Sequence, residues 1–383
     1  MYYINTELKL IDGKKIRYNN DYLLTIKEDI EKFLDTEKYM SNLRFAKKMM
    51  MSQEIKSNNS IEGIYDDLTL IDEVIKNKNQ LSNIEKSRIV NLYHGYQYIL
   101  THQNINKESI KELYKILSDG LLDAYSINNM GKYYREKPVY ILKGDRLDVE
   151  PYQGMDEKYV EEYMDKLFKY INNDNNVSNN KIDYFIKSQI IHFYFVYIHP
   201  YFDINGRTSR TTSMWYLLNN KSYPYIIFNR SIAFNQRNYE PTIITTRKTG
   251  NITLFLKYIL ENVKTEFEKE YIIHTITELC NSKLTKDNLQ TLEYILTMKC
   301  NLTLKDFVTT YNRFNDKKDI KDIIVEKFEP LVKKNIIIPG ENTKGYINKY
   351  NELNNYYFSL NDKFIDIDKN KIKNLKIERF IKK

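Results

Sequence analysis

The sequence predicts a mainly α-helical protein in which strands are confined to short hairpins. Across most of the 383 residues, apolar side chains recur at three- and four-residue spacing, which is typical of helices that bury one face. Two regions break this rhythm, near residues 137–149 and 336–360, and each reads as a pair of short strands. The chain is long enough for two or three domains, each with its own core.

The composition limits the class of protein. The chain is 42% hydrophobic and 29% charged, which is typical of a globular protein. Its two cysteines have no metal-site spacing and favour a reducing compartment. No leader of basic then apolar residues follows Met1, and no run of about 18 apolar residues occurs, so we expect a cytoplasmic protein without a membrane partner. The net charge of +8 permits nucleic-acid contact without requiring it. The abundance of Lys, Asn, Ile and Tyr favours a bacterial source.

The N-terminal part is expected to be irregular over residues 1–20, with a turn at Asp12-Gly13. A helix begins near Tyr22, and a second helix is predicted over 38–57, with Gly63 just past its end. The same periodicity predicts further helices over 68–78, 84–103, 107–118, 156–171, 181–198, 207–219 and 254–280. Between them, 137–142 and 146–149 are expected to form two strands around a turn that contains Gly144.

A cluster of ionisable and polar residues directly follows the apolar helix predicted over 181–198. Pro200 disfavours helix at His199, and Asn205-Gly206 marks a turn before the next helix. A helix N-terminus binds anions, and Arg207 and Arg210 lie about one turn apart there, which suits a polyphosphate. Asp203 would hold Mg²⁺ on the phosphates, and His199 would act as a base near neutral pH. His192, on the preceding helix, is interpreted instead as a core histidine.

The twelve residues 199–210, HPYFDINGRTSR, resemble the Fic active-site motif H-x-F-x-[D/E]-G-N-G-R-x-x-R. They match it at His199, Asp203, Asn205, Gly206, Arg207 and Arg210. Tyr201 replaces the usual Phe, and Ile204 replaces the first Gly, which leaves the choice of nucleotide open. The resemblance implies a Fic fold, which is a helical bundle with a β-hairpin flap, and a protein adenylyltransferase that uses ATP and Mg²⁺. In that reaction, His199 deprotonates the target hydroxyl, Asp203 holds the metal, and Asn205, Gly206, Arg207 and Arg210 bind the phosphates.

A second stretch resembles the inhibitory motif of the Fic family, [S/T]-x-x-x-E-[G/N]. Glu62 and Gly63 match it, whereas Asn58 occupies the Ser/Thr position. The resemblance places the chain in the class with an N-terminal inhibitory helix, where Glu62 pairs with Arg210 and competes with the γ-phosphate of the nucleotide for that guanidinium. It also places the flap at Val139, Tyr140, Ile141 and Leu142, where a target segment adds a strand. Asn235, Gln236 and Tyr239 fall where the family has residues near the adenine.

The C-terminal part is expected to be a separate domain. Helices over 286–299, 305–311 and 320–334 precede the strand pair 336–340 and 355–360, an order that resembles a winged helix. The longest of these helices carries both lysines and acidic residues, so DNA binding and a docking role stay equally open. The predicted parts are an N-terminal helical region at 1–80, the catalytic core at 81–282, the winged-helix-like domain at 285–365 and a Lys-rich tail at 366–383.

The predicted function is transfer of AMP from ATP to a Tyr, Thr or Ser hydroxyl of a target protein, with Glu62 holding the enzyme inhibited. Modification of the chain itself and assembly into a homo-oligomer stay open. Two alternatives remain: a nucleotide-sensing DNA-binding regulator, and a Fic enzyme that removes AMP or transfers another nucleotide.

Overall fold

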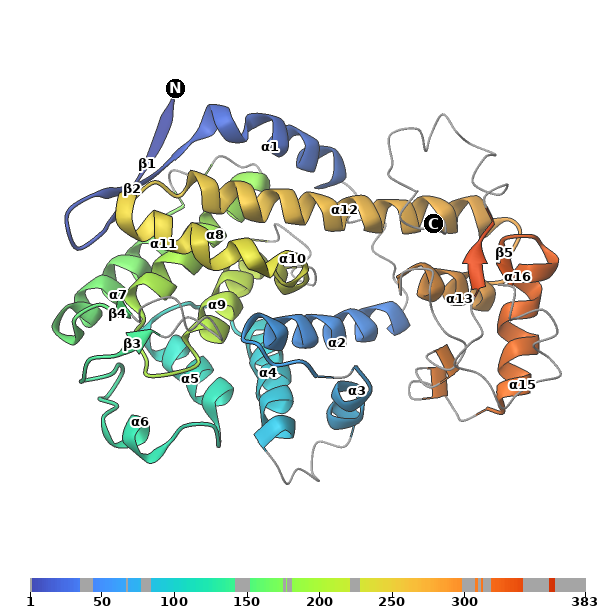
Figure 1. Ribbon diagram of the computed structural model, residues 1–383, viewed down its shortest axis with the longest axis horizontal. Coiled ribbons are helices and arrows are strands. Elements are labelled where there is room, and N and C mark those ends of the chain that lie inside the picture. Colours follow the sequence, from blue (N-terminus) through green and yellow to red (C-terminus); the bar gives the residue numbers. More distant parts are fainter. Residues whose placement is uncertain are drawn as a thin grey trace. The chain divides into compact units, whose positions relative to one another are not determined.

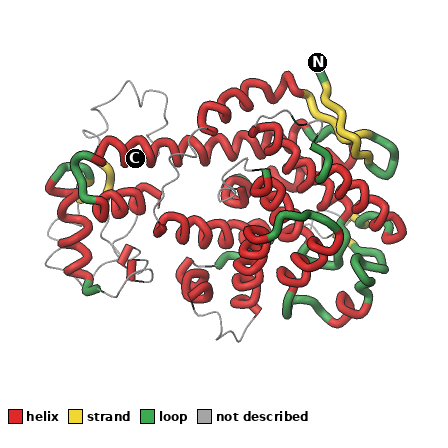
Figure 2. Tube along the Cα trace, turned by 180° about the vertical axis from the view of Figure 1, so that it is seen from behind, coloured by secondary structure: helices red, strands yellow, loops and turns green. Residues whose placement is uncertain are grey.

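The computed structural model describes residues 2–34, 44–66, 68–76, 84–141, 152–174, 177, 181–220, 228–297, 307–308, 311–312, 318–339 and 358–361. The chain forms two compact units. The first comprises Met1–Leu34 and Met51–Lys264, and the second comprises Asp35–Met50 and Thr265–Lys383. Helices dominate the described residues (Figure 1), and strands appear only as short pairs (Figure 2), so the predicted mainly helical fold is confirmed.

The elements up to the end of the first unit are, in chain order, β1 Tyr3–Lys9, β2 Lys15–Asn19, α1 Asn20–Leu34, α2 Arg44–Ile61, α3 Leu68–Lys76, α4 Ile84–Thr101, α5 Lys107–Ser118, α6 Ala124–Asn128, β3 Tyr140–Ile141, β4 Tyr152–Gln153, α7 Glu157–Ile171, α8 Lys181–Ile198, α9 Asn205–Asn219, α10 Phe228–Phe234, η3 Gln236–Asn238, α11 Tyr239–Thr249 and α12 Thr253–Asn281. Helices α5 and α8 have the predicted bounds. The short helices α6 and α10 were not predicted.

The core of the first unit is built on α8 and α9, which pack side by side (Figure 1). Almost every residue of α8 is buried, as expected for a helix that is apolar on all sides. Helix α9 faces it with small hydroxyl residues, which let the two backbones approach. The Ser213 hydroxyl donates to the Ser188 carbonyl at 2.5 Å, and the Thr212 hydroxyl donates back to the Thr208 carbonyl at 2.8 Å. Helices α4 and α5 pack on α9, while α1 and α7 pack on α8. This close pair fixes the turn between its two helices, residues 199–204.

The irregular N-terminus expected from the sequence is wrong, because β1 and β2 form an antiparallel pair. The turn at Asp12-Gly13 is present, with Gly13 at φ +83°. Two tyrosines of α8 anchor the hairpin: the Tyr194 hydroxyl donates to the Lys9 carbonyl at 2.7 Å, and the Ile11 N–H donates to the Tyr197 hydroxyl at 2.8 Å. Contacts with a helix more than 180 residues away therefore stabilise strands that the local pattern left ambiguous.

The hairpin predicted near 137–149 is present with a later second strand. Tyr140 and Ile141 pair antiparallel with Gln153 and Tyr152. The expected second strand, 146–149, and the flap residue Leu142 lie outside the described residues.

The second unit contains α13 Lys286–Thr297, α15 Ile320–Ile323, the π-helical turn η4 Ile324–Phe328, α16 Glu329–Lys333, β5 Ile337–Pro339 and β6 Phe358–Leu360. Strands β5 and β6 pair antiparallel, as the sequence predicts. The ring of Phe328 packs edge-on against Phe307 in the core of this unit. The winged-helix assignment stays a prediction. Among the described residues, no helix combines the length and the apolar character needed to cross a bilayer.

Candidate functional site

A cavity of about 320 Å³ opens beside the turn that joins α8 to α9. This volume lies at the lower end of the range of about 300–1,000 Å³ that is typical of ligand pockets. The walls come from the end of α2, from β3, from the α8–α9 turn and from α11. The lining residues are Ile61, Glu62, Tyr140, Ile141, Val196, His199, Phe202, Asp203, Asn205, Gly206, Arg210, Tyr239, Glu240, Ile243 and Ile244.

His199 follows the last residue of α8 and lines the cavity. Pro200 ends the helix, and His199 adopts the left-handed conformation at φ +53° while its N–H still donates to the Phe195 carbonyl at 2.9 Å. The ring Nδ1 is buried and has no hydrogen-bond partner among the described residues. Burial, assisted by the positive charge of Arg135, lowers the pKa of His199 to about 3. The imidazole is therefore neutral at pH 7, as a proton acceptor must be, but its lowered pKa makes it a weaker base than the free histidine side chain expected from the sequence.

Ile204 occupies the position where the Fic motif has its first glycine. Its φ is +64°, in the left-handed region that glycine adopts freely and that a β-branched residue avoids. Its side chain is only 6% exposed, so apolar burial offsets part of this strain. The substitution keeps the loop geometry that glycine would favour at a cost in backbone energy of about 1–2 kcal/mol.

The turn itself is held by Asn205, the first residue of α9. Its Oδ1 accepts from the Tyr201 N–H at 3.0 Å, and its Nδ2 donates to the Tyr201 carbonyl at 2.8 Å. The Tyr201 ring is fully buried and stacks on Tyr114 of α5. Asn205 thus lies on the cavity wall, and its amide clamps the loop.

The N-terminus of α9 faces the cavity without a side-chain cap. Uncapped N–H groups at a helix start form an anion site. The carboxylate of Glu62 lies against this site, because a Cβ atom on Gly206 would overlap its Oε1. In this structure, an anionic group of the chain itself therefore covers the backbone of Gly206.

Arg210 and Glu62 form an ion pair at 2.6 Å, in which the guanidinium is buried and the carboxylate is 35% exposed. Asn58 supports the same guanidinium: its Oδ1 accepts from Nη2 at 2.7 Å and from Nε at 3.1 Å. Burial alone would raise the pKa of Glu62, but the charges of Arg210 and Arg207 outweigh it, and the pKa is lowered. Glu62 is therefore ionised at neutral pH. The asparagine in the Ser/Thr position of the inhibitory motif provides a direct contact to Arg210.

Arg207 is 5% exposed, and its Nε is buried without a hydrogen-bond partner among the described residues. Burial lowers its pKa, while the nearby carboxylate of Glu62 acts in the opposite direction. Two guanidinium groups thus lie close to Glu62.

A buried polar network that no sequence motif predicts lies behind Arg210. Asn58 Nδ2 donates to the Tyr96 hydroxyl at 2.9 Å, and Asn229 Nδ2 donates to the same hydroxyl at 3.2 Å. Glu54 accepts from the backbone N–H groups of Asn229 and Arg230 at 2.6 and 3.2 Å. The network links α2, α4 and α10 to the guanidinium of α9. No local signal marks it, because its members are brought together only by tertiary packing.

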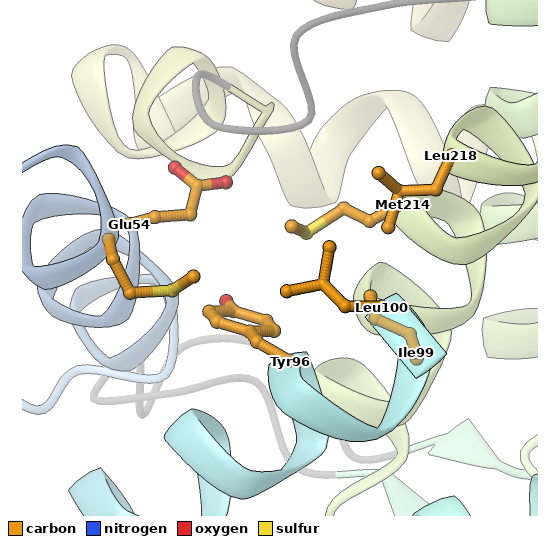
Figure 3. A pocket seen from close by; sticks show the side chains of 7 residues that line it. Glu54, Tyr96, Ile99, Leu100, Met214 and Leu218 are labelled. Carbon is orange, nitrogen blue, oxygen red and sulfur yellow. The ribbon is translucent and has the colours of Figure 1, made fainter. Parts of the chain in front are cut away.

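Glu54 and Tyr96 border a small space of about 10 Å³, large enough for about one water molecule. Figure 3 shows the two side chains with Ile99, Leu100, Met214 and Leu218 around this space. Glu54 is 1% exposed, and burial raises its pKa to about 8 despite two backbone donors. A buried carboxyl group therefore lies in α2, the helix that leads into Glu62.

Asp203 is the residue predicted to hold Mg²⁺. It is exposed on the cavity wall, and its Oδ1 accepts from the Ile204 N–H at 2.6 Å. Among the described residues, no group of three or more His, Cys, Asp or Glu side chains could hold a metal alone. A single carboxylate fits Mg²⁺ binding when the phosphates of a nucleotide supply further oxygens.

Of the residues expected near the adenine, Tyr239 lines the cavity, and its hydroxyl lies 2.7 Å from Nε2 of His192. His192 is fully buried, which agrees with its interpretation as a core histidine. Gln236 Nε2 donates to the Ile61 carbonyl at 2.7 Å and so connects η3 to the end of α2. Asn235 directly precedes η3 and does not line the cavity. From the predicted flap, Tyr140 and Ile141 lie on the cavity wall, and the Val139 carbonyl accepts from the Gly154 N–H at 2.8 Å.

Comparisons with known proteins identify a family domain and a fold. The Fic/DOC family model matches residues 104–217, a span that contains the α8–α9 turn but not α2 or η3. A Fic family protein from Desulfovibrio desulfuricans G20 aligns over 89% of this chain and 94% of its own, with a TM-score of 0.55 and 17% identity. Fic-1 (aa134–508) from C. elegans aligns over 65% of this chain and 71% of its own, with a TM-score of 0.51 and 16% identity. At these identities the structural likeness shows the fold alone.

Proposed function

Because this chain carries a Fic/DOC family domain in a Fic fold, we propose that it transfers AMP from ATP to a hydroxyl group of a protein. Members of this family commonly transfer AMP or other nucleotides to proteins. One observation carries the proposal: a neutral imidazole, an uncapped helix N-terminus and a buried guanidinium line the same cavity. These are the groups that the reaction requires.

His199 is the general base. It takes the proton of a Tyr, Thr or Ser hydroxyl as that oxygen attacks the α-phosphorus, a P–O bond to the target forms, and the bond to pyrophosphate breaks. The low pKa of His199 keeps the ring unprotonated before the attack. Because His199 follows α8 directly and Asn205 clamps the adjacent loop, the base is held in place before the substrates arrive.

The phosphates bind at the start of α9. The backbone N–H groups near Gly206 and the guanidinium groups of Arg207 and Arg210 favour the negative charge that moves to the leaving group. Asp203 would hold the Mg²⁺ that accompanies ATP, and the ion would supply positive charge to the phosphates there. The residues of this chain contribute mainly position and electrostatic stabilisation.

Glu62 inhibits the reaction. Its carboxylate pairs with Arg210 and covers Gly206, so it occupies the two places where the γ-phosphate would bind. Competition for one guanidinium is a direct form of inhibition, since carboxylate and phosphate are alternative partners for the same donors.

The test is the intact mass of the full chain and of an added protein extract after incubation with Mg²⁺ and each nucleoside triphosphate in turn. With Glu62→Gly, we expect a gain of one AMP on a protein hydroxyl when ATP is present. With Glu62→Gly combined with His199→Ala, we expect no gain while ATP still binds by calorimetry. Binding of ATP without any transfer by Glu62→Gly would contradict the proposal and favour a nucleotide-sensing regulator. Loss of AMP from a pre-modified target would favour the removal reaction instead.

A further inference from the structure

The segment that enters the β3/β4 hairpin contains a buried arginine that the function above does not use. Arg135 is 2% exposed. Its backbone is fixed on both sides, because Arg135 forms an isolated bridge with Met130 and its N–H donates to the Pro200 carbonyl at 3.0 Å. A cation at this depth requires compensation, since burying an uncompensated charge is costly.

The guanidinium is compensated by three backbone carbonyl groups from three places in the chain. Its Nε donates to the carbonyl of His199 at 2.9 Å. Its Nη1 donates to the carbonyl of Lys137 at 2.9 Å, and its Nη2 donates to the carbonyl of Met155. Lys137 precedes β3 and Met155 follows β4, and these two flanking positions are called the feet of the hairpin below. One planar guanidinium group therefore bonds both feet and the backbone of His199, whose imidazole lines the cavity.

We infer that Arg135 is a positioning residue that ties the feet of the β3/β4 hairpin to the backbone of His199, so that the base and the hairpin are held in one geometry. The inference rests on the proposed function, in which His199 is the base. Arginine suits this place because its donors diverge in a rigid fork, whereas the lysine ammonium is a compact point charge. The three acceptors point at different edges of that fork.

The conformation of His199 explains why such a tie is needed. A non-glycine residue at φ +53° is strained, and strained residues persist when their surroundings over-determine them. The His199 carbonyl also lies just past the C-terminus of α8, where carbonyl groups lack helical partners and cations are favoured. Arg135 satisfies that carbonyl and fixes the peptide that carries the ring.

The same charge acts on the chemistry of the ring. After burial, Arg135 is the largest cause that lowers the pKa of His199. A residue that served folding alone would leave kcat unchanged in a variant that still folds. The two roles are therefore separable by experiment.

The experiment uses the full chain with Glu62→Gly as the parent, and adds Arg135→Lys, Arg135→Gln or the control Lys132→Gln. Lys132 is exposed three residues away, so its change removes the same charge without removing a buried contact. Two quantities are measured: kcat for AMP transfer against the Kd for ATP, and the pKa of His199 from an NMR titration of the five histidines assigned with His199→Ala.

We expect Arg135→Lys to lower kcat by about tenfold or more with the Kd for ATP within about twofold, since it keeps the charge but loses the fork. Arg135→Gln should lower kcat similarly and raise the pKa of His199, while Lys132→Gln should change neither quantity. An unchanged kcat in a folded Arg135→Lys chain overturns the inference, and that variant decides the matter if Arg135→Gln does not fold. If the parent transfers no nucleotide, the proposed function fails, and the NMR spectrum decides: an unchanged chemical shift of the His199 ring in Arg135→Lys, which keeps the charge, overturns the inference.

Discussion

At the residue scale, the site depends on backbone conformations that side chains rarely adopt. His199 and Ile204 bracket the α8–α9 turn, and both have positive φ. Such residues cost free energy and occur where function requires a fixed geometry. The sequence singled out both positions, His199 as a predicted base and Ile204 as a departure from the glycine of the motif. It could not show the positive φ at His199, because that conformation appears only in the folded turn.

The strain at Ile204 predicts an inverted ranking of two substitutions. Ile204→Ala and Ile204→Gly both remove almost all apolar contacts of the side chain. Only glycine adopts the positive φ without strain. We expect the glycine variant to be more stable than the alanine variant by about 1 kcal/mol, the reverse of their order in a helix interior. The measurement is urea unfolding followed by the fluorescence of Trp215, the single tryptophan, which is buried in the first unit. An alanine variant as stable as the glycine variant would refute the strained conformation.

Glu54 predicts how stability changes with pH. Its pKa in the folded chain is about 8 against an ordinary value of 4.5. Between these values the folded state keeps a proton that the unfolded state has lost, so the free energy of unfolding falls as the pH rises through this window. Glu54→Gln removes this dependence. The difference in free energy of unfolding between Glu54→Gln and wild type should therefore shift in favour of the variant by at least about 1 kcal/mol from about pH 5 to about pH 9.

The same fluorescence experiment at the two pH values measures this difference. Glu73→Gln is the matched control, because Glu73 is exposed on α3. Parallel pH curves for wild type and Glu54→Gln would show that Glu54 is ionised in the folded chain and would refute the prediction.

At the element scale, α2 does more than carry Glu62. Its inner face is attached through Glu54 to the start of α10 and through Asn58 to Tyr96 of α4. The Glu62 carboxylate therefore reaches Arg210 from a helix that is fixed at two other points. The sequence predicted a helix here and the partial motif. It could not predict the network, because Tyr96 lies 38 residues from Asn58, and Asn229 lies 133 residues from Tyr96.

Tyr96→Phe tests whether this network supports the proposed inhibition by Glu62. Without the hydroxyl, the Nδ2 groups of Asn58 and Asn229 both lose their acceptor, and Asn58 holds Arg210 less firmly. If the contacts that hold Arg210 in the inhibited state weaken by about 0.5–1 kcal/mol, labelled AMP should be transferred about two- to fivefold faster than by wild type. Tyr98→Phe, on the same helix and stacked on His102, should leave the rate unchanged. Equal rates for wild type and Tyr96→Phe would show that the network does not contribute to inhibition.

At the scale of the whole molecule, sequence patterns predicted the elements that are stabilised locally and missed those that depend on distant contacts. Helix α5 was found with its bounds because its apolar residues recur at helical spacing, and α8 because Pro200 ends a continuous apolar run. The β1/β2 hairpin was missed because its stability comes from hydroxyl groups of α8 and from backbone bonds between Arg17 and the residues beside Asn251. Gly250 shows how close that contact is, since a Cβ there would lie 2.6 Å from the Lys15 carbonyl oxygen.

In the candidate site, too, residues of a local motif could be predicted and residues brought in by distant contacts could not. The contiguous motif between His199 and Arg210 could be identified from the sequence, and the structure brings most of it to one cavity. Arg135, Tyr96 and Glu54 could not be identified, because nothing in their local sequence distinguishes them from ordinary core or surface residues. Their positions follow only from the fold, which places them behind the motif residues that they support.

The most direct test is the initial rate of AMP transfer by wild type and by Glu62→Gly, measured side by side at saturating ATP and Mg²⁺ with the same labelled nucleotide. If Glu62 withholds Arg210 from the γ-phosphate, the variant should be faster by about tenfold or more, which corresponds to about 1.4 kcal/mol. Equal rates for the two chains at equal ATP occupancy would contradict the claim that this ion pair controls a nucleotide-transfer site.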